Sequence, residues 1–145
     1  MNIPQNSLIL VGDGQKALFL RNKGDAKFPN LVTEDVSVDD NPPTHEQGAD
    51  RPGRAFQSAA SNRRSSVEET DWHELAKHRF ARQIASRLEQ LVRAQQAASI
   101  VLVAPPRVLA DLRDALSDDV KQRVLAEIDK DLTKLPVWEI EARLT

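Results

Sequence analysis

The sequence predicts an α/β fold: one domain over residues 1–145, built on a mixed β-sheet with helices packed against it. A chain of 145 residues has the length of one ordinary domain and can bury a single core. Two short apolar runs, residues 7–11 and 17–20, open the chain, and a third at 100–104 follows a long helical pattern. Strands first, followed by strands that alternate with helices, indicate a mixed sheet.

The opening segment has the pattern of a small antiparallel meander. Residues 7–11 form a compact apolar run that ends at Gly12-Asp13-Gly14, as a buried strand before a turn would. Residues 17–20 follow closely enough to complete a hairpin. After a second turn, residues 31–38 alternate loosely between apolar and polar side chains, which predicts a third strand with one covered face.

Residues 39–70 predict a long, mobile loop. Apolar residues become scarce there, and the prolines, glycines and serines leave no regular period. Loops of this length are uncommon inside compact domains and are usually either functional or disordered.

A long amphipathic helix is expected to begin at Asp71, because Asp71 and Glu74 resemble a capping box. Its apolar residues recur at helical spacing, which predicts one face buried against the sheet. They are Trp72, Leu75, Ala76, Phe80, Ile84, Leu88 and Leu91.

The last third alternates strands and helices. Residues 100–104 are continuously apolar, as in a central strand covered on both faces. Pro105 and Pro106 suit the first turn of a helix, and Ser117 suits the N-cap of a short one through residue 122. Residues 124–128 predict another strand. Pro136 then begins a helix whose Trp138, like Trp72, is expected to anchor its helix to the sheet.

Composition excludes several classes of function. The 20 basic and 22 acidic residues give a net charge of −2, so binding to nucleic acid requires a local basic patch. The absence of cysteine excludes disulfides, thiol catalysis and thiolate zinc sites. The N-terminus has no basic region, and its first apolar run is far shorter than the ~20 residues of a span. We therefore expect a cytoplasmic protein without membrane insertion.

Three separated motifs carry a family resemblance: Gly12-Asp13-Gly14, Val-Ala-Pro-Pro-Arg at 103–107, and Glu-Ile-Asp-Lys-Asp-Leu-Thr at 127–133. With them, nearly the whole chain resembles the bacterial host attachment proteins. The resemblance implies a requirement in the attachment of bacteria to host cells.

The order of elements is also similar to that of the middle domain of archaeal and eukaryotic peptide-chain release factors, which implies a ribonuclease-H-like topology. In those factors, a Gly-Gly-Gln tip lies in the loop between the third strand and the long helix. The corresponding loop here contains Arg51-Pro52-Gly53-Arg54 and no Gly-Gly-Gln. We therefore do not expect peptidyl-tRNA hydrolysis.

The arginines are the candidate binding residues. Residues 51–66 contain four arginines and no acid, and guanidinium groups suit phosphate oxygens, with flexible backbone amides such as that of Gly53 adding donors. This pattern predicts an anionic partner, either RNA or the ribosome. The alternative is a solvated loop and helix face. The proposed contacts are Arg51, Gly53, Arg54, Arg63 and Arg64, joined by Arg79 and Arg82 on one flank of the helix.

We expect no enzymatic activity, cofactor or metal. The sequence lacks a Ser-His-Asp signature, a P-loop and a dinucleotide glycine pattern. His73 and His78 are five residues apart, whereas a zinc-binding helix places its histidines four apart.

Two other hypotheses stay open. The first is a metal-dependent nuclease or hydrolase in which Asp13 binds an ion together with Glu74, Asp129 and Asp131. Against it, Asp13 between two glycines is an ordinary turn residue. The second is a protein-interaction module whose loop becomes ordered on a bacterial protein partner.

Overall fold

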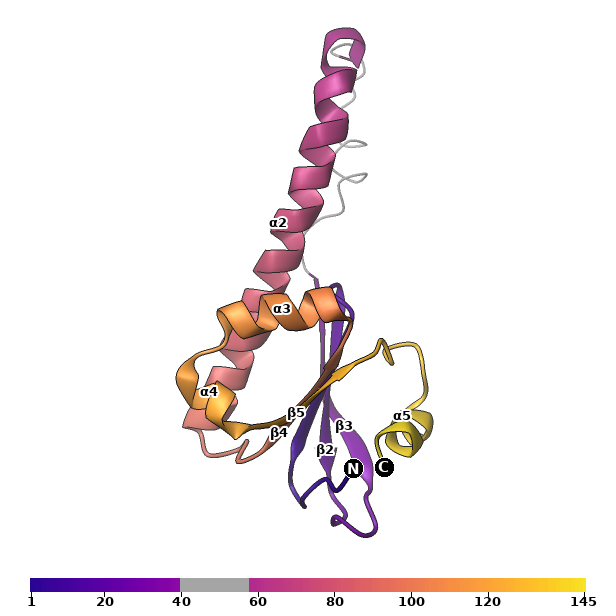
Figure 1. Ribbon diagram of the computed structural model, residues 1–145, viewed down its shortest axis with the longest axis vertical. Coiled ribbons are helices and arrows are strands. Elements are labelled where there is room, and N and C mark those ends of the chain that lie inside the picture. Colours follow the sequence, from indigo (N-terminus) through magenta and orange to yellow (C-terminus); the bar gives the residue numbers. More distant parts are fainter. Residues whose placement is uncertain (40–57) are drawn as a thin grey trace.

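The computed structural model describes the backbone of residues 1–39 and 58–145, and the side chains of residues 1–39 and 75–145. Five strands and four helices make up the described chain, labelled as in Figure 1. The strands are β1 (Leu8–Gly12), β2 (Lys16–Asn22), β3 (Leu31–Val38), β4 (Ile100–Ala104) and β5 (Val124–Asp129). The helices are α2 (Ser58–Arg93), α3 (Pro106–Ala115), α4 (Asp118–Arg123) and α5 (Val137–Leu144).

The strands form one mixed sheet in the order β3-β2-β1-β4-β5. β1, β2 and β3 are an antiparallel meander, whereas β4 and β5 run parallel to β1. The predicted mixed sheet with packed helices is therefore confirmed. The carboxyl ends of β1, β4 and β5 consequently meet at one end of the sheet.

Each face of the sheet is covered by helices. α2, α3 and α4 lie on one face, and α5 lies on the other (Figure 1). Leu8 and Leu10 point to the first face, while Ile9 and Val11 point to the second. All five residues of β1 and of β4 are buried, which explains their continuously apolar sequences.

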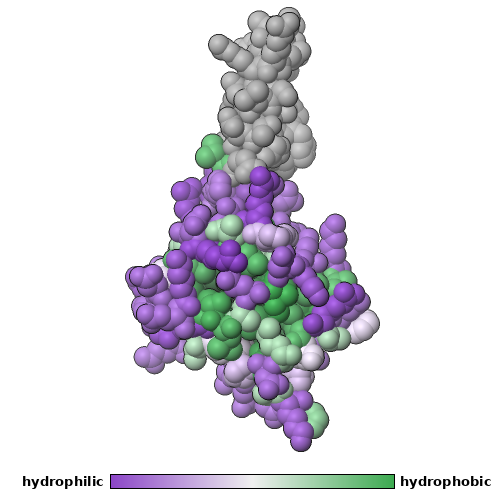
Figure 2. Space-filling view, in the orientation of Figure 1, coloured by the Kyte–Doolittle hydropathy of each residue, from purple (hydrophilic) through white to green (hydrophobic). Residues whose placement is uncertain are grey.

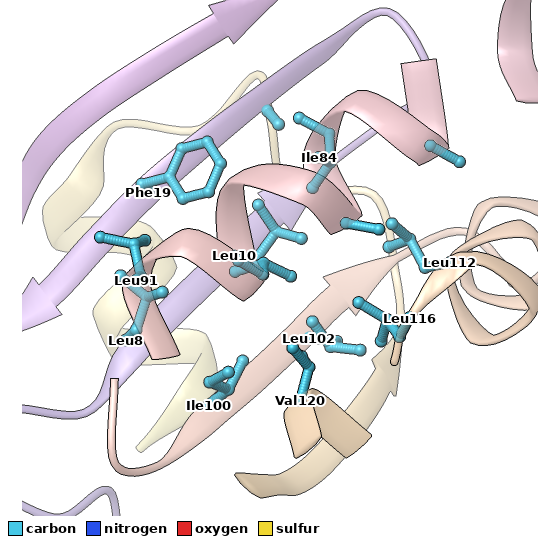
Figure 3. Close-up of a cluster of buried hydrophobic side chains, with 14 of the residues drawn as sticks. Leu8, Leu10, Phe19, Ile84, Leu91, Ile100, Leu102, Leu112, Leu116 and Val120 are labelled. Carbon is cyan, nitrogen blue, oxygen red and sulfur yellow. The ribbon is translucent and has the colours of Figure 1, made fainter. Parts of the chain in front are cut away.

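The core under α2 is close-packed (Figure 3). Leu102 from the sheet, Ile84 from α2 and Leu112 from α3 belong to the same cluster. Leu116 and Val120 close it at the α3–α4 connection, where Ser117 Oγ accepts a hydrogen bond from the Val120 amide at 3.4 Å. The predicted N-cap at Ser117 is confirmed.

The start of α2 corrects the sequence prediction. The helix begins at Ser58, so residues 58–70 are helical instead of belonging to the expected loop, and Asp71 does not begin the helix. No glycine or proline occurs between Gly53 and Pro105, and alanine, arginine and glutamate favour helix. The serine-rich composition hid this tendency. Residues 40–57 lie outside the described residues, so the expected mobility of the loop is untested there.

β3 departs from its prediction in burial. Only Leu31 is buried, and Val36 and Val38 are 45% and 57% exposed, so neither face of the strand is covered. β3 lies at the edge of the sheet, where the helices on the two faces give it little cover. Its polar residues, including Glu34 and Asp35, suit this position.

α5 also differs from expectation in one residue. Ile140 and Leu144 are buried against the sheet, as their spacing of four predicts. Trp138 is 71% exposed and does not anchor the helix, because it stands two residues before Ile140 and so on the opposite side of α5. The side chain of Trp72 lies outside the described residues.

A buried arginine holds the start of the meander to the end of α2. Arg21 is 8% exposed and donates hydrogen bonds to the backbone oxygens of Asn6 and Gln96 and to the Glu34 carboxylate, the last from Nε at 3.0 Å. Partial burial alone raises the pKa of Glu34. The hydrogen bond and charge of Arg21, with the charge of Lys23, outweigh that effect and leave the pKa lowered.

Candidate functional site

The structure describes only part of the predicted arginine site. Arg51, Gly53 and Arg54 lie outside the described residues. Arg63 and Arg64 belong to α2, but their side chains lie outside the description. Arg79 and Arg82 are both described on α2, Arg79 half-buried and Arg82 exposed. The predicted convergence of loop and helix is therefore untested.

The described half of α2 is strongly basic. Residues 75–93 contain five lysines and arginines and one acid, Glu89, in a chain whose net charge is −2. Arg93 pairs with Glu89 at 3.0 Å, and Arg87 lies 3.8 Å from Asp35 of β3. Arg82 makes no ion pair with any residue that the structure describes.

In sequence, the two basic regions are not continuous. Residues 67–74 contain four acids and no lysine or arginine, and they separate Arg64 from Lys77. The arginines at residues 51–64 and those at residues 79–93 are therefore two separate elements of the candidate site, which an experiment can test one at a time.

A contact between α2 and α3 fixes the helix near the point where it leaves the sheet. His78 Nδ1 lies 3.0 Å from Asp111 Oδ1, with Asp111 largely buried. From the sequence alone, His78 is rejected as a metal ligand and counted among the basic residues of the helix, and no partner is assigned to Asp111. The pairing involves residues on different helices, so no spacing within one helix could reveal it.

Beside this contact lies a small cavity of about 20 Å³, with room for one water molecule. It is enclosed by the hairpin of β1 and β2, by α2 and by α3, and its lining is mostly apolar. Lys77 and Asp111 are its charged lining residues. A space of this size does not hold an organic substrate.

The carboxyl ends of the parallel strands carry a second polar cluster. Asp13 follows β1, and its Oδ1 accepts hydrogen bonds from the backbone amides of Gln15 and Lys16 at 2.9 and 2.8 Å. The Thr133 hydroxyl, in the segment after β5, lies 3.1 Å from Asp13 Oδ2 and 2.7 Å from Asp131 Oδ1. A hydroxyl has one hydrogen, so Thr133 donates to one of these carboxylates at a time.

This cluster brings together two of the four carboxylates considered for metal chemistry. Asp13 and Asp131 both approach Thr133, whereas Asp129 has no hydrogen bond to either within the described residues. The Glu74 side chain lies outside the description. Across the described side chains, no group of three or more histidines or acids is placed to hold a metal ion. Asp13 instead has the turn contacts that its position between two glycines predicts.

Comparison with known protein families agrees with the sequence motifs. A search of curated proteins found no match. No helix in the described part of the chain is both long and apolar enough to cross a membrane. Residues 8–144 match the family model described as "protein required for attachment to host cells". This match covers nearly the whole chain, from β1 through α5, so the chain belongs to the host attachment protein family.

Proposed function

We propose that this host attachment protein is a cytoplasmic, non-enzymatic binding protein that presents arginines to RNA, either free or in the ribosome. The contacts come from Arg51, Gly53, Arg54, Arg63 and Arg64, and from Arg79 and Arg82 on α2. Its link to attachment follows from this binding. The release-factor similarity and the ribonuclease-H-like topology stay predictions.

The observation that carries the proposal is the charge of α2. Five bases against one acid over residues 75–93 give a local positive surface on a chain that is weakly acidic overall. α2 also runs past the carboxyl ends of β1 and β4, so its amino-terminal half projects from the sheet (Figure 1). The described half of α2 carries Arg82, which forms no ion pair within the described residues and can bring a guanidinium group to the phosphates of a large nucleic acid.

The experiment is a binding assay with purified ribosomes and with mixed RNA, at low and at moderate salt. The parent chain is compared with two variants. One, called the loop variant after the predicted loop, changes Arg51 and Arg54 and the α2 residues Arg63 and Arg64 to alanine. The other, the helix variant, is Arg79→Ala with Arg82→Ala. Binding that weakens as salt rises, and that each variant reduces, supports the proposal because phosphate contacts release counterions.

Arg143→Ala is the matched control. Arg143 lies on α5, on the opposite face of the sheet, and pairs with Glu139 at 3.5 Å. This variant removes one positive charge without touching the proposed surface, so RNA binding should persist. If the parent chain binds neither ribosomes nor RNA at low salt, the proposal is wrong. The protein-interaction hypothesis would then stand, because a mainly apolar interface needs no salt-sensitive contacts.

The nuclease hypothesis rests on Asp13 and Asp131, which converge on Thr133. It requires RNA cleavage that depends on Mg²⁺ or Mn²⁺ and that Asp13→Ala abolishes while the fold survives. Cleavage by the parent chain that is lost in this variant would replace the binding proposal with an enzymatic one.

A further inference from the structure

The two edges of the sheet differ in how their backbone is protected. At β3, the Leu31 amide donates a hydrogen bond to the Glu141 carboxylate of α5 at 2.8 Å, and the Val36 amide donates one to the Asp35 carboxylate at 2.8 Å. An irregularity in the β2–β3 register interrupts the same strand. Side-chain acceptors, acidic residues and a bulge are the features by which proteins prevent pairing at an edge.

β5, the opposite edge, has less protection. Within the described chain, no side chain forms a hydrogen bond to a backbone group of Val124 through Asp129. The β4–β5 register shifts only at the start of β5 and is regular from Ala126 to Asp129. Two backbone groups of β5 are bonded locally, because the Val124 amide donates to the Lys121 oxygen and the Lys130 amide donates to the Ile128 oxygen. The rest of the outer edge of β5 is a template for another strand.

The surface around β5 contains an apolar patch beside its charged residues. Figure 2 shows hydrophobic atoms gathered across the middle of the face on which Figure 1 places β5, between α4 and α5. Leu125 is 54% exposed, and Val124, Ala126 and Ile128 are only partly buried. The strand therefore presents both hydrogen-bonding groups and apolar side chains to a partner.

The charges along β5 are arranged with opposite signs at its two ends. Lys121 and Arg123 precede the strand, and Asp129 ends it. Arg123 Nε is buried and has no hydrogen-bond partner among the described residues, and Asp129 makes no ion pair with them. Arg123 and Asp129 therefore each carry a charge that has no ion pair among the described residues and that a group of opposite charge on a partner can meet.

We propose that β5 is a self-association edge, at which two copies of this chain pair their β5 strands antiparallel about a two-fold axis. The axis lies near Ala126, the midpoint between Arg123 and Asp129. Antiparallel pairing places the basic start of one strand beside the acidic end of the other. Arg123 of each copy then lies opposite Asp129 of the other copy, which makes two symmetric ion pairs. The two sheets join into one continuous sheet, and Leu125 becomes covered.

Of the two edge strands, β5 is better suited than β3 to pair with a second copy of the chain. At β3 the amides of Leu31 and Val36 are already bonded to the carboxylates of Glu141 and Asp35, so that edge offers fewer free groups for symmetric pairing. A six-residue strand contributes less than the roughly 800 Å² per partner of a standard interface. The dimer should therefore dissociate on dilution through about the micromolar range.

The test is sedimentation velocity of the full chain over a range of concentrations. The parent chain should shift from monomer to dimer as concentration rises. Arg123→Asp and Asp129→Arg should each weaken association by about tenfold or more, because each opposes like charges. The double variant, Arg123→Asp with Asp129→Arg, restores opposite charges and should return association to near the parent value.

Two further variants keep the test decisive. Circular dichroism would reveal whether Arg123→Asp impairs folding. Leu125→Asp changes an exposed residue, so it should keep the fold and still weaken association. Val38→Asp, at the β3 edge, is the matched control and should leave association unchanged. A chain that stays monomeric at all concentrations would overturn the proposal. So would a double variant no better than the single ones, or an equal loss with Val38→Asp.

Discussion

The hydroxyl of Thr133 lies 3.1 Å from Asp13 Oδ2, which joins the segment after β5 to the turn after β1 across 120 residues of sequence. Thr133 is 5% exposed, and its hydroxyl is also 2.7 Å from Asp131 Oδ1. Two of the three motifs that carry the family resemblance thus meet at one point. Their contact ties the segment after β5 to the turn after β1.

Thr133→Val should lower the free energy of unfolding. Valine keeps the shape of threonine but leaves the Asp13 and Asp131 carboxylates without this donor, so we expect a loss of about 1–3 kcal/mol. Urea denaturation measures it. Thr133→Ser keeps the hydroxyl and should recover most of the loss. Thr145→Val, which removes an exposed hydroxyl bonded to the Glu141 carbonyl, should cost clearly less. Equal losses at positions 133 and 145 would contradict this role.

Gly14→Ala should destabilise the hairpin, whereas Gly12→Ala should not. Gly14 has φ +95°, a conformation that costs residues with a Cβ about 1–2 kcal/mol. A Cβ at Gly12 would meet its nearest atom, Lys16 O, at 3.6 Å, an ordinary contact, and the backbone there needs no glycine. Thermal unfolding of the two variants compares them directly. A lower melting temperature for Gly12→Ala than for Gly14→Ala would show that space, and not backbone conformation, limits this turn.

The sequence predicted the sheet well because burial leaves a clear pattern. Val101 and Leu102 point to opposite faces, and both faces are covered, so an unbroken apolar run indicated an inner strand. The edge strand β3 was harder, since Val36 and Val38 have the same alternation as a half-buried strand but remain exposed. Exposure depends on which elements lie beside the strand, and one strand's sequence does not contain that information.

The candidate site was predictable only where it is local. The Asp13 turn follows from three adjacent residues, and the structure shows its amide contacts. The Asp13–Thr133 and His78–Asp111 contacts join distant segments, so no spacing could predict them. The predicted start of α2 was wrong for a different reason. Serine has an intermediate helix propensity, so it occurs in both loops and helices. The absence of glycine and proline was the better indication that residues 58–70 are helical.

Glu34→Gln should reduce stability at about pH 7 and have little effect at about pH 3. The folded pKa of Glu34 lies below its usual value of 4.5, so ionisation favours the folded state. That contribution is present above the unfolded pKa and is lost as pH falls through the folded one. Because Glu34 is largely exposed, the effect at neutral pH should stay below about 1 kcal/mol.

Chemical denaturation at the two pH values measures this difference. Glu139→Gln is the control, since Glu139 forms an exposed pair with Arg143 that contributes about 0.3–0.5 kcal/mol at most. A Glu34→Gln variant that is destabilised equally at both pH values would show that packing, and not the charge on Glu34, holds Arg21 in place.

The salt dependence of RNA binding should report how many arginines contact phosphate. For single-stranded RNA, each contact contributes about 0.7 to the slope of log K against log salt concentration. The loop variant lacks Arg51, Arg54, Arg63 and Arg64, so its slope should fall by up to about 3, and that of the Arg79→Ala, Arg82→Ala variant by up to about 1.4. Arg143→Ala should keep the parent slope. If the loop variant binds more weakly with an unchanged slope, its arginines act on the protein's own structure and not on phosphate.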